Sequence, residues 1–295
     1  MAEVLNTQQP PEIGGRHLLD NAAQELVRLA KLSDQQIGQI EAYGKAHGVS
    51  FLEAAVAIGA VKRENLMTAL SRQYNYPIIG DDVGLPELSR ELVIGHEPFG
   101  AAAEIIRSIR TSIVSSAVAQ GVRSFVIIGS REGQGVSFVA GNLAVAFAQM
   151  AVNTLLVDAN LRDPRIAGMF GLDPNREGLS DVLLGMGMDH PAIAKDVLPG
   201  LSVLPAGGVP PNPQELLCGG EFMALTAKFS VDYGIVIYDS SNAMDYSDAY
   251  VIASRVGAAI VVGRQNHASF KDLKLVSEKL REHQCTIVGA IVNDF

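Results

Sequence analysis

Six short runs of valine, isoleucine and leucine recur through residues 97–295, and stretches with helical periodicity separate most of them. A strand that is exposed on one face alternates polar and apolar residues, whereas these runs are almost continuously apolar. They therefore predict strands covered by helices on both faces, the α/β arrangement of a doubly wound, mostly parallel sheet. The six expected strands are Ser124–Gly129, Thr154–Asp158, Leu201–Pro205, Gly234–Asp239, Ala258–Gly263 and Thr286–Asn293.

A glycine-rich turn follows the first expected strand and opens the next helix. Gly133 and Gly135 allow successive backbone N–H groups to point inward as a nest for an anion, and Ser137 offers the hydroxyl that a Mg²⁺ ion prefers. Strand, turn and helix in this order are the context of a phosphate-binding loop, so the expected fold is P-loop NTPase-like. The residues expected to contact nucleotide here are Arg131, Gly133, Gln134, Gly135, Val136, Ser137 and Phe138.

Val136 stands where a phosphate-binding loop normally carries a lysine. The lost charge-assisted hydrogen bond is worth roughly 1.5–3 kcal/mol, which corresponds to about 10- to 100-fold in nucleotide affinity. Catalysis should lose more, because this lysine also stabilises charge on the phosphoryl group during transfer. Binding can therefore persist where turnover fails. Arg131, five residues earlier, either replaces part of the missing charge or is an ordinary solvent-facing loop arginine.

Two further expected strands end in an acid. The segments Leu155–Asp158 and Ile235–Asp239 would place both carboxylates at the carboxyl edge of the sheet, beside the glycine-rich turn. A carboxylate in this position can hold Mg²⁺ directly or through water, so Asp158 and Asp239 are the expected catalytic acids. Together with Ser137 they form the expected metal site. The competing interpretation is that both acids only cap loops.

The motifs of one known family recur in five segments, which are Glu104–Arg110 (E-x-x-R-x-x-R), Val157–Pro164, Leu204–Leu217 (containing P-P-N-P-x-E-L-L), Ser247–Ala249 and Gly289–Asn293. On these segments, residues 97–295 resemble the bacterial tyrosine kinases, the cytoplasmic ATPase module of polysaccharide co-polymerases. That module is related to the MinD-type ATPases. The resemblance covers roughly two-thirds of the chain, and the combination of motifs in this order is specific.

The resemblance implies a site for ATP or ADP with Mg²⁺, with Asn293 near the adenine and Arg131 where MinD-type ATPases place a second lysine. It also implies that Glu104, Arg107 and Arg110 lie in the interface of a homo-oligomeric ring. Residues three apart on a helix share a face, so the three side chains could meet one partner. The alternative for the two arginines is a solvated helix face. The implied protein partner is a membrane-embedded polysaccharide co-polymerase or chain-length determinant.

The chain departs from the family pattern at several positions. Besides Val136, the second acid of the D-x-D element is Asn160, the segment Asp239–Asn242 replaces D-T-P-P, and no tyrosine follows Tyr250. These departures favour a degenerate, nucleotide-binding or pseudo-ATPase regulator of bacterial exopolysaccharide synthesis or export, with weak or absent enzymatic activity. The alternatives are an active, atypical protein-tyrosine autokinase or ATPase and a MinD-like positioning factor. The P-P-N-P-x-E-L-L loop argues against the last of these.

The N-terminal residues 16–78 have helical periodicity and no convincing strand, so they predict a small all-helical domain. A disordered tail over 1–15 is expected before it, and a linker over 79–96 is expected after it. Asp20 is the expected N-cap of the first helix. Ser33 with Gln36, and Ser50 with Glu53, carry capping-box signatures for the next two, Asp34–Ala46 and Phe51–Ile58, and a fourth helix is expected from about Lys62 to Tyr74.

The segment Ala69–Pro77 makes this domain resemble the N-terminal helical domain of secretion and pilus ATPases. Some domains of that kind bind cyclic di-GMP through a turn that contains arginine and glycine. The corresponding turn here, Val49–Leu52, has neither residue. An arginine would pair with the phosphate and a glycine would let the backbone approach the guanine, so cyclic di-GMP is not an expected ligand.

The composition narrows the possible partners and location. A net charge of −9 disfavours nucleic acid as a partner, and Cys218 and Cys285 form no motif and suit a reducing cytoplasm. No apolar run approaches the roughly 18 residues that a membrane span needs. These features lead us to expect a cytoplasmic protein, and the partner that the resemblance implies would make it peripheral to the inner membrane.

Overall fold

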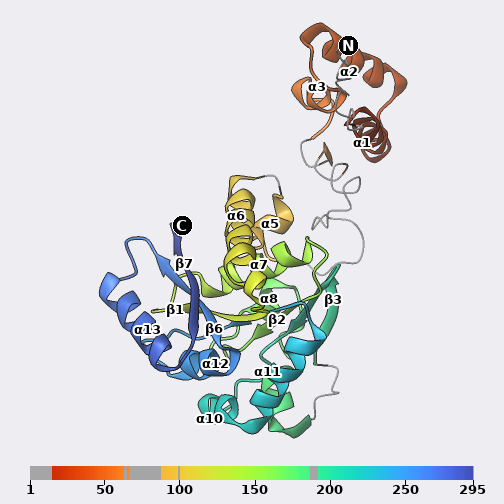
Figure 1. Cartoon of the computed structure of the whole chain (residues 1–295). Helices are drawn as coiled ribbons and strands as arrows, with labels where there is room; N and C mark the ends of the chain where they lie inside the picture. Colours follow the sequence, from red (N-terminus) through yellow and green to blue (C-terminus); the bar gives the residue numbers. More distant parts are fainter. Residues whose placement is uncertain are drawn as a thin grey trace, which may run out of the picture. The chain divides into compact units, whose positions relative to one another are not determined.

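The computed structural model describes residues 15–62, 65–66, 69, 88–98, 100–186 and 192–294. The chain separates into two compact units, residues 1–78 and 79–295, and each is described by itself (Figure 1). Most of the expected tail, most of the expected fourth helix and half of the expected linker fall outside the described residues. Among the described helices, none combines the length and the apolar composition that crossing a membrane requires.

The described part of the N-terminal unit includes the helices α1 (Gly15–Ala30), α2 (Asp34–His47) and α3 (Phe51–Ala57). Both predicted capping boxes are present. The Ser33 hydroxyl accepts the N–H of Gln36, the Ser50 hydroxyl accepts the N–H of Glu53, and each N3 side chain returns to the N-cap backbone. These bonds begin the helices by satisfying N–H groups that lack intrahelical partners. The apolar faces share a small core of Ala22, Leu26, Ile40, Leu52, Ala54, Ala55, Val61 and Ala69.

The prediction that Asp20 caps the first helix is wrong. Helix α1 begins at Gly15, so Asp20 lies inside it. In the sequence, Leu18 and Leu19 precede Ala22 and Leu26 at helical spacing, so the apolar pattern extends to the N-terminal side of Asp20. That pattern favours a longer helix, and an aspartate tolerates an interior position at only a modest cost.

The C-terminal unit is built on one seven-stranded sheet with the order β3-β4-β2-β5-β1-β6-β7, and only the β3–β4 pair is antiparallel (Figure 1). Six strands confirm the prediction to within one residue at each end: β1 (Ser124–Gly129), β2 (Thr154–Asp158), β4 (Leu201–Leu204), β5 (Ile235–Asp239), β6 (Ala258–Arg264) and β7 (Thr286–Asn293). Strand β3 (Ala194–Leu198) was not predicted. Lys195 and Asp196 interrupt its apolar pattern, which an edge strand tolerates.

Helices cover both faces of the sheet, which confirms the doubly wound α/β fold. One face packs against α5 (Val93–His96), α6 (Ala101–Ser116), α7 (Val136–Ala148) and α8 (Ile166–Met169). The other packs against α9 (Leu179–Asp181), α10 (Pro213–Cys218), α11 (Gly220–Asp232), α12 (Asp248–Val256) and α13 (Phe270–Glu282). Helix α7 is buried on nearly all sides, as its alanine- and valine-rich sequence allows.

Strands β1, β2 and β5 lie in the middle of the sheet, so their carboxyl ends meet at one edge. Asp158 is the register partner of Asp239 across β2 and β5, and Ile127 is the partner of Asp239 across β1 and β5. The turn that leaves β1 after Gly129 therefore emerges beside both acids. This register brings together the three elements that the sequence predicts to form one site.

Candidate nucleotide site

The turn between β1 and α7 presents a row of backbone donors. Gly133 has φ 74° and Gly135 has φ 86°, left-handed backbone values that residues other than glycine rarely adopt. No hydrogen bond between described residues uses the N–H groups of residues 133–137. Helix α7 begins at Val136, so its positive dipole end lies at the same place. Successive N–H groups at a helix N-terminus form a ready site for phosphate.

Val136 turns its side chain toward the core. It packs against the apolar cluster under α5, α6 and α7. A Cβ atom at Gly129 would lie 2.7 Å from Val136 Cγ2, so only glycine at the end of β1 leaves room for this side chain. The position that carries the phosphate-reaching cation in related loops therefore contributes hydrophobic packing here and no charge. Phe138 packs, partly buried, against the same apolar cluster.

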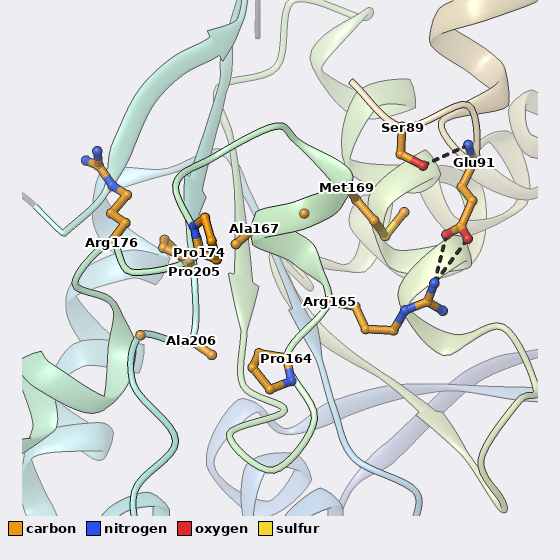
Figure 2. A pocket seen from close by; sticks show the side chains of 12 residues that line it. Ser89, Glu91, Pro164, Arg165, Ala167, Met169, Pro174, Arg176, Pro205 and Ala206 are labelled. Carbon is orange, nitrogen blue, oxygen red and sulfur yellow. Dashed lines mark hydrogen bonds and ion pairs between the residues drawn. The ribbon is translucent and has the colours of Figure 1, made fainter. Parts of the chain in front are cut away.

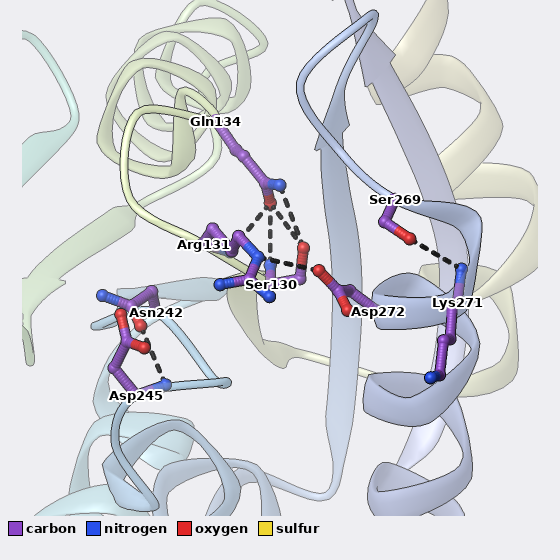
Figure 3. A network of polar contacts seen from close by, with 8 residues as sticks. All are labelled: Ser130, Arg131, Gln134, Asn242, Asp245, Ser269, Lys271 and Asp272. Atoms are coloured by element: carbon purple, nitrogen blue, oxygen red, sulfur yellow. Dashed lines mark hydrogen bonds and ion pairs between the residues drawn. The ribbon is translucent and has the colours of Figure 1, made fainter.

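Arg131 is held by a neighbouring helix. Its Nε donates to Asp272 Oδ2 at 2.7 Å, and Asp272 lies in the first turn of α13 (Figure 3). The Asp272 carboxylate raises the pKa of the Arg131 guanidinium through this bond. About half of the arginine side chain is exposed. In this arrangement Arg131 fastens the glycine-rich turn to α13, and its charge is balanced by Asp272.

The two carboxylate oxygens of Asp239 differ in their hydrogen bonding. The Ser137 hydroxyl donates to Asp239 Oδ2 at 2.6 Å, while Asp239 Oδ1 has no hydrogen-bond partner among the described residues. The carboxyl is fully buried. A buried oxygen beside a serine hydroxyl fits the ligand preference of Mg²⁺, which keeps several waters and takes few protein ligands. In the described part of the chain, no three His, Cys, Asp or Glu side chains cluster as a metal cage.

Asp158 is satisfied by the backbone. It accepts N–H bonds from Asn160 (3.2 Å), Arg165 (3.2 Å) and Ile166 (3.0 Å). Asp158 thus caps the loop after β2, whereas Asp239 Oδ1 has no partner among the described residues, and the expected catalytic and metal-binding roles of both acids stay predictions. Asn160, which replaces the second acid of the family motif, closes the same loop by donating to the Asp163 carbonyl at 2.7 Å.

Burial controls the ionisation of both acids. Desolvation raises the pKa of Asp239 to about 7, and the Ser137 hydrogen bond acts in the opposite direction. Desolvation, followed by the nearby charge of Asp239, raises the pKa of Asp158 well above its usual range. Two adjacent buried carboxyls carry little negative charge at neutral pH unless a bound cation compensates it.

The pKa of Asp239 predicts a pH-dependent stability. The folded state keeps a proton that the unfolded chain releases near pH 3.8, so stability should fall as pH rises from about 4 to about 7. Asp239→Asn should reduce this slope to the share that Asp158 contributes, and should raise the melting temperature at pH 8 by about 2–8 °C, because one buried charge fewer forms. Calorimetry at pH 5, 6.5 and 8 measures how the melting temperature depends on pH. Asp196→Asn, at an exposed acid on the edge strand β3, is the control, and equal slopes in wild type and Asp239→Asn would contradict the assignment.

Arg162 and Asp248 form a pair that the sequence did not reveal. Arg162 donates to the Asp248 carboxylate through Nε (2.6 Å) and Nη2 (3.1 Å), and its guanidinium lies over the Tyr246 ring at 4.2 Å. Asp248 is almost fully buried. The pair joins the loop after β2 to the start of α12. The two side chains are 86 residues apart in the sequence, and the S-D-A motif was the only sequence signal that included Asp248.

Glu104, Arg107 and Arg110 lie on α6, and their expected role in a homo-oligomeric interface stays a prediction. Glu104 has a side-chain exposure of 68%, but that of Arg107 is 16%, and its guanidinium donates to Glu104 and to the Pro98 carbonyl. Arg110 donates to the Ala146 carbonyl of α7 at 2.8 Å. Long arginine side chains curl back to bury their stems and satisfy backbone acceptors. The two arginines therefore fasten α6 to its own unit.

A cavity of about 390 Å³ adjoins the Asp158 loop (Figure 2). Pro164, Pro174 and Pro205 contribute to its walls, with Arg165 paired to Glu91 on one side and Arg176 on the other. The sequence did not predict it, because its lining comes from separate segments near residues 90, 165, 175 and 206. Asn293 lies on the opposite side of the turn, where its Nδ2 donates to the Gln134 carbonyl at 3.3 Å.

The chain is similar to several bacterial tyrosine kinases, although no family model matches it. The tyrosine-protein kinase YwqD of Bacillus subtilis is 31% identical over 206 residues, which covers 70% of this chain and 86% of YwqD. The solved kinase domain of the Escherichia coli tyrosine kinase Etk matches with a TM-score of 0.66 and 30% identity, over 69% of this chain and 79% of that chain.

Two further comparisons define the extent of the likeness. MinD of Pyrococcus horikoshii, solved with Mg-ADP, matches with a TM-score of 0.51 and 23% identity over 58% of this chain and 69% of that one, and so shares the fold. The chain spans only 39% of EpsB of Ralstonia solanacearum and 28% of the tyrosine-protein kinase Wzc of Salmonella typhi. On its sequence and its fold, the chain belongs to the bacterial tyrosine-protein kinase family, and its larger unit has the P-loop ATPase fold of MinD.

Proposed function

We propose that this chain is a kinase-like nucleotide-binding regulator of bacterial exopolysaccharide synthesis or export, with little or no phosphoryl transfer of its own. One observation carries the proposal: Val136 packs, partly buried, against the core where the family's cation would reach the phosphates, while the N–H groups of residues 133–137 make no hydrogen bond among the described residues. Backbone donors bind phosphate without a side-chain charge. Transfer needs more, because charge that develops on the phosphoryl group must be stabilised at that moment.

ATP or ADP with Mg²⁺ is the proposed ligand. Ser137 and Asp239 would hold the ion, which would neutralise phosphate charge, and Asn293 would lie toward the base. Asp158 fixes the loop beside them through its three backbone bonds. Since Asn160 replaces the second acid of the family motif, a single open carboxylate remains for the metal.

Calorimetry with ATP and ADP, each with and without Mg²⁺, tests the proposal. We expect binding about 10- to 100-fold weaker than that of YwqD, because one charge-assisted hydrogen bond is missing. We also expect no measurable ATP turnover. Turnover at the rate of YwqD, abolished by Asp158→Asn, would show instead an active, atypical autokinase or ATPase.

That alternative requires a substitute for the lysine. Arg131 is the available candidate, but its guanidinium is paired with Asp272, which offsets its charge. The observed pair therefore favours the regulator. The MinD-like positioning factor is the weaker alternative, since identity to MinD is 23% and identity to YwqD is 31%.

The proposed protein partner is a membrane-embedded polysaccharide co-polymerase, which would hold this chain at the cytoplasmic side of the inner membrane. Helix α6 offers a surface for that partner or for a second copy. Its outer face is exposed, and Ile105 is 61% exposed on it. The hydroxyls of Ser112, Ser115 and Ser116 donate to carbonyls within the helix, so covering them would leave few groups unsatisfied.

Ile105→Lys should break this contact without unfolding the chain. A lysine in a buried interface is costly, whereas an exposed position on a helix accepts it with little change in stability. Light scattering and a partner pull-down measure the effect, with the melting temperature recorded in parallel. Val231→Lys, at an 84% exposed apolar residue on α11, is the control. Equal mass and equal capture for both variants would exclude α6 as the interface.

A further inference from the structure

The side chain of Gln134 lies completely buried beneath the glycine-rich turn (Figure 3). Its Oε1 accepts the N–H of Ser130 at 2.7 Å and the N–H of Arg131 at 3.3 Å. Its Nε2 donates to the Ser130 hydroxyl at 2.9 Å. A buried amide is costly unless its hydrogen bonds are made, and here both ends are bonded. The entry to the turn is thus fixed by a side chain from within the turn.

Two side chains from neighbouring strands hold the carbonyls of the same segment. Asn293, at the end of β7, donates from Nδ2 to the Gln134 carbonyl at 3.3 Å. Arg264, at the end of β6, donates from Nη1 to the Gly133 carbonyl at 3.3 Å. In a trans peptide the C=O and the following N–H point in opposite directions. Anchoring these carbonyls toward β6 and β7 therefore aims the N–H groups of Gln134 and Gly135 the other way.

The backbone donors of the turn are consequently divided into two sets. The N–H groups of Ser130 and Arg131 are used by Gln134, whereas those of residues 133–137 make no hydrogen bond among the described residues. We propose that Gln134 is a positioning residue that, with Asn293 and Arg264, presets this second set toward phosphate. Anion binding would then survive the loss of the lysine. This inference rests on the proposed nucleotide-binding function.

Gln134→Met tests the proposal in the full chain, because methionine has a similar length and no amide. Amide hydrogen exchange reports the two N–H groups that Gln134 holds, and calorimetry with Mg-ADP reports binding. We expect faster exchange at Ser130 and Arg131. We also expect about tenfold weaker ADP binding, which corresponds to a turn whose binding conformation is populated in about one tenth of the molecules. Glu132→Gln, an exposed position in the same turn, should leave exchange unchanged.

Gln134→Glu separates position from charge. Its carboxylate still accepts both N–H groups, so exchange should remain slow while the added negative charge weakens ADP binding. If Gln134→Met binds ADP within twofold of the wild type and keeps slow exchange, the positioning role is wrong. If the wild type binds no Mg-ADP, the proposed function fails. In that case accelerated exchange in Gln134→Met alone would still establish that Gln134 holds the turn, and unchanged exchange would overturn it.

Discussion

Val136→Lys should tighten ATP and ADP binding by about 10- to 100-fold, the value of one restored charge-assisted hydrogen bond. The added ammonium would act beside existing phosphate donors, because the N–H groups of residues 133–137 make no hydrogen bond among the described residues and α7 begins at residue 136. A lysine stem can cover the apolar surface that valine now touches while its ammonium reaches the phosphates. Isothermal titration calorimetry with ADP at constant salt measures the change.

Two controls define this result. Val136→Met introduces an unbranched side chain of about the reach of lysine but without the charge, so it should leave the affinity near that of the wild type. Raising the salt concentration should weaken binding by Val136→Lys more than binding by the wild type, because the restored interaction is between charges. An affinity gain below twofold in Val136→Lys would mean that the turn, and not the missing cation, limits binding.

Gly178→Ala should cause the largest loss of stability. An added Cβ would lie 2.2 Å from both the Gly207 nitrogen and the Pro205 oxygen, and these are backbone atoms that cannot swing away. The next residue fixes this close approach, since Leu179 donates its N–H to the Pro205 carbonyl at 2.8 Å. We expect a cost of about 3 kcal/mol or more, which is about 6–12 °C in melting temperature.

Gly208→Ala is the matched control for this loop. A Cβ at Gly208 meets nothing within 4 Å, so the substitution should change stability by less than about 0.5 kcal/mol. Denaturant unfolding of both variants measures the difference. Because Pro205 and Gly207 line the cavity beside the Asp158 loop, Gly178→Ala should also distort that cavity. Equal stability of the two glycine variants would show that the loop after β4 shifts without cost.

The strands and two of the helix starts could be predicted because their causes are local. Buried parallel strands need continuous apolar runs, and β1, β2 and β5 have them. A capping box needs a serine and an acid or amide three residues apart, and Ser33 with Gln36 provides it. Asp20 misled the prediction because an N-cap preference is small, and the apolar stripe of α1 outweighed it. Strand β3 could not be predicted because it forms only where β4 offers an edge.

The sequence by itself determined the α/β fold, the glycine-rich turn, the two acid-ended strands and the absence of a lysine at residue 136. Only the tertiary structure decided how those residues are used. In the folded chain, Arg107 and Arg110 donate to backbone carbonyls of their own unit, and Arg131 pairs with Asp272. Asp158 accepts backbone N–H groups, and one oxygen of Asp239 has no hydrogen-bond partner among the described residues. The reason is physical. Local patterns fix backbone conformation, whereas the partner of a long or buried polar side chain depends on distant groups that only folding brings within hydrogen-bonding distance.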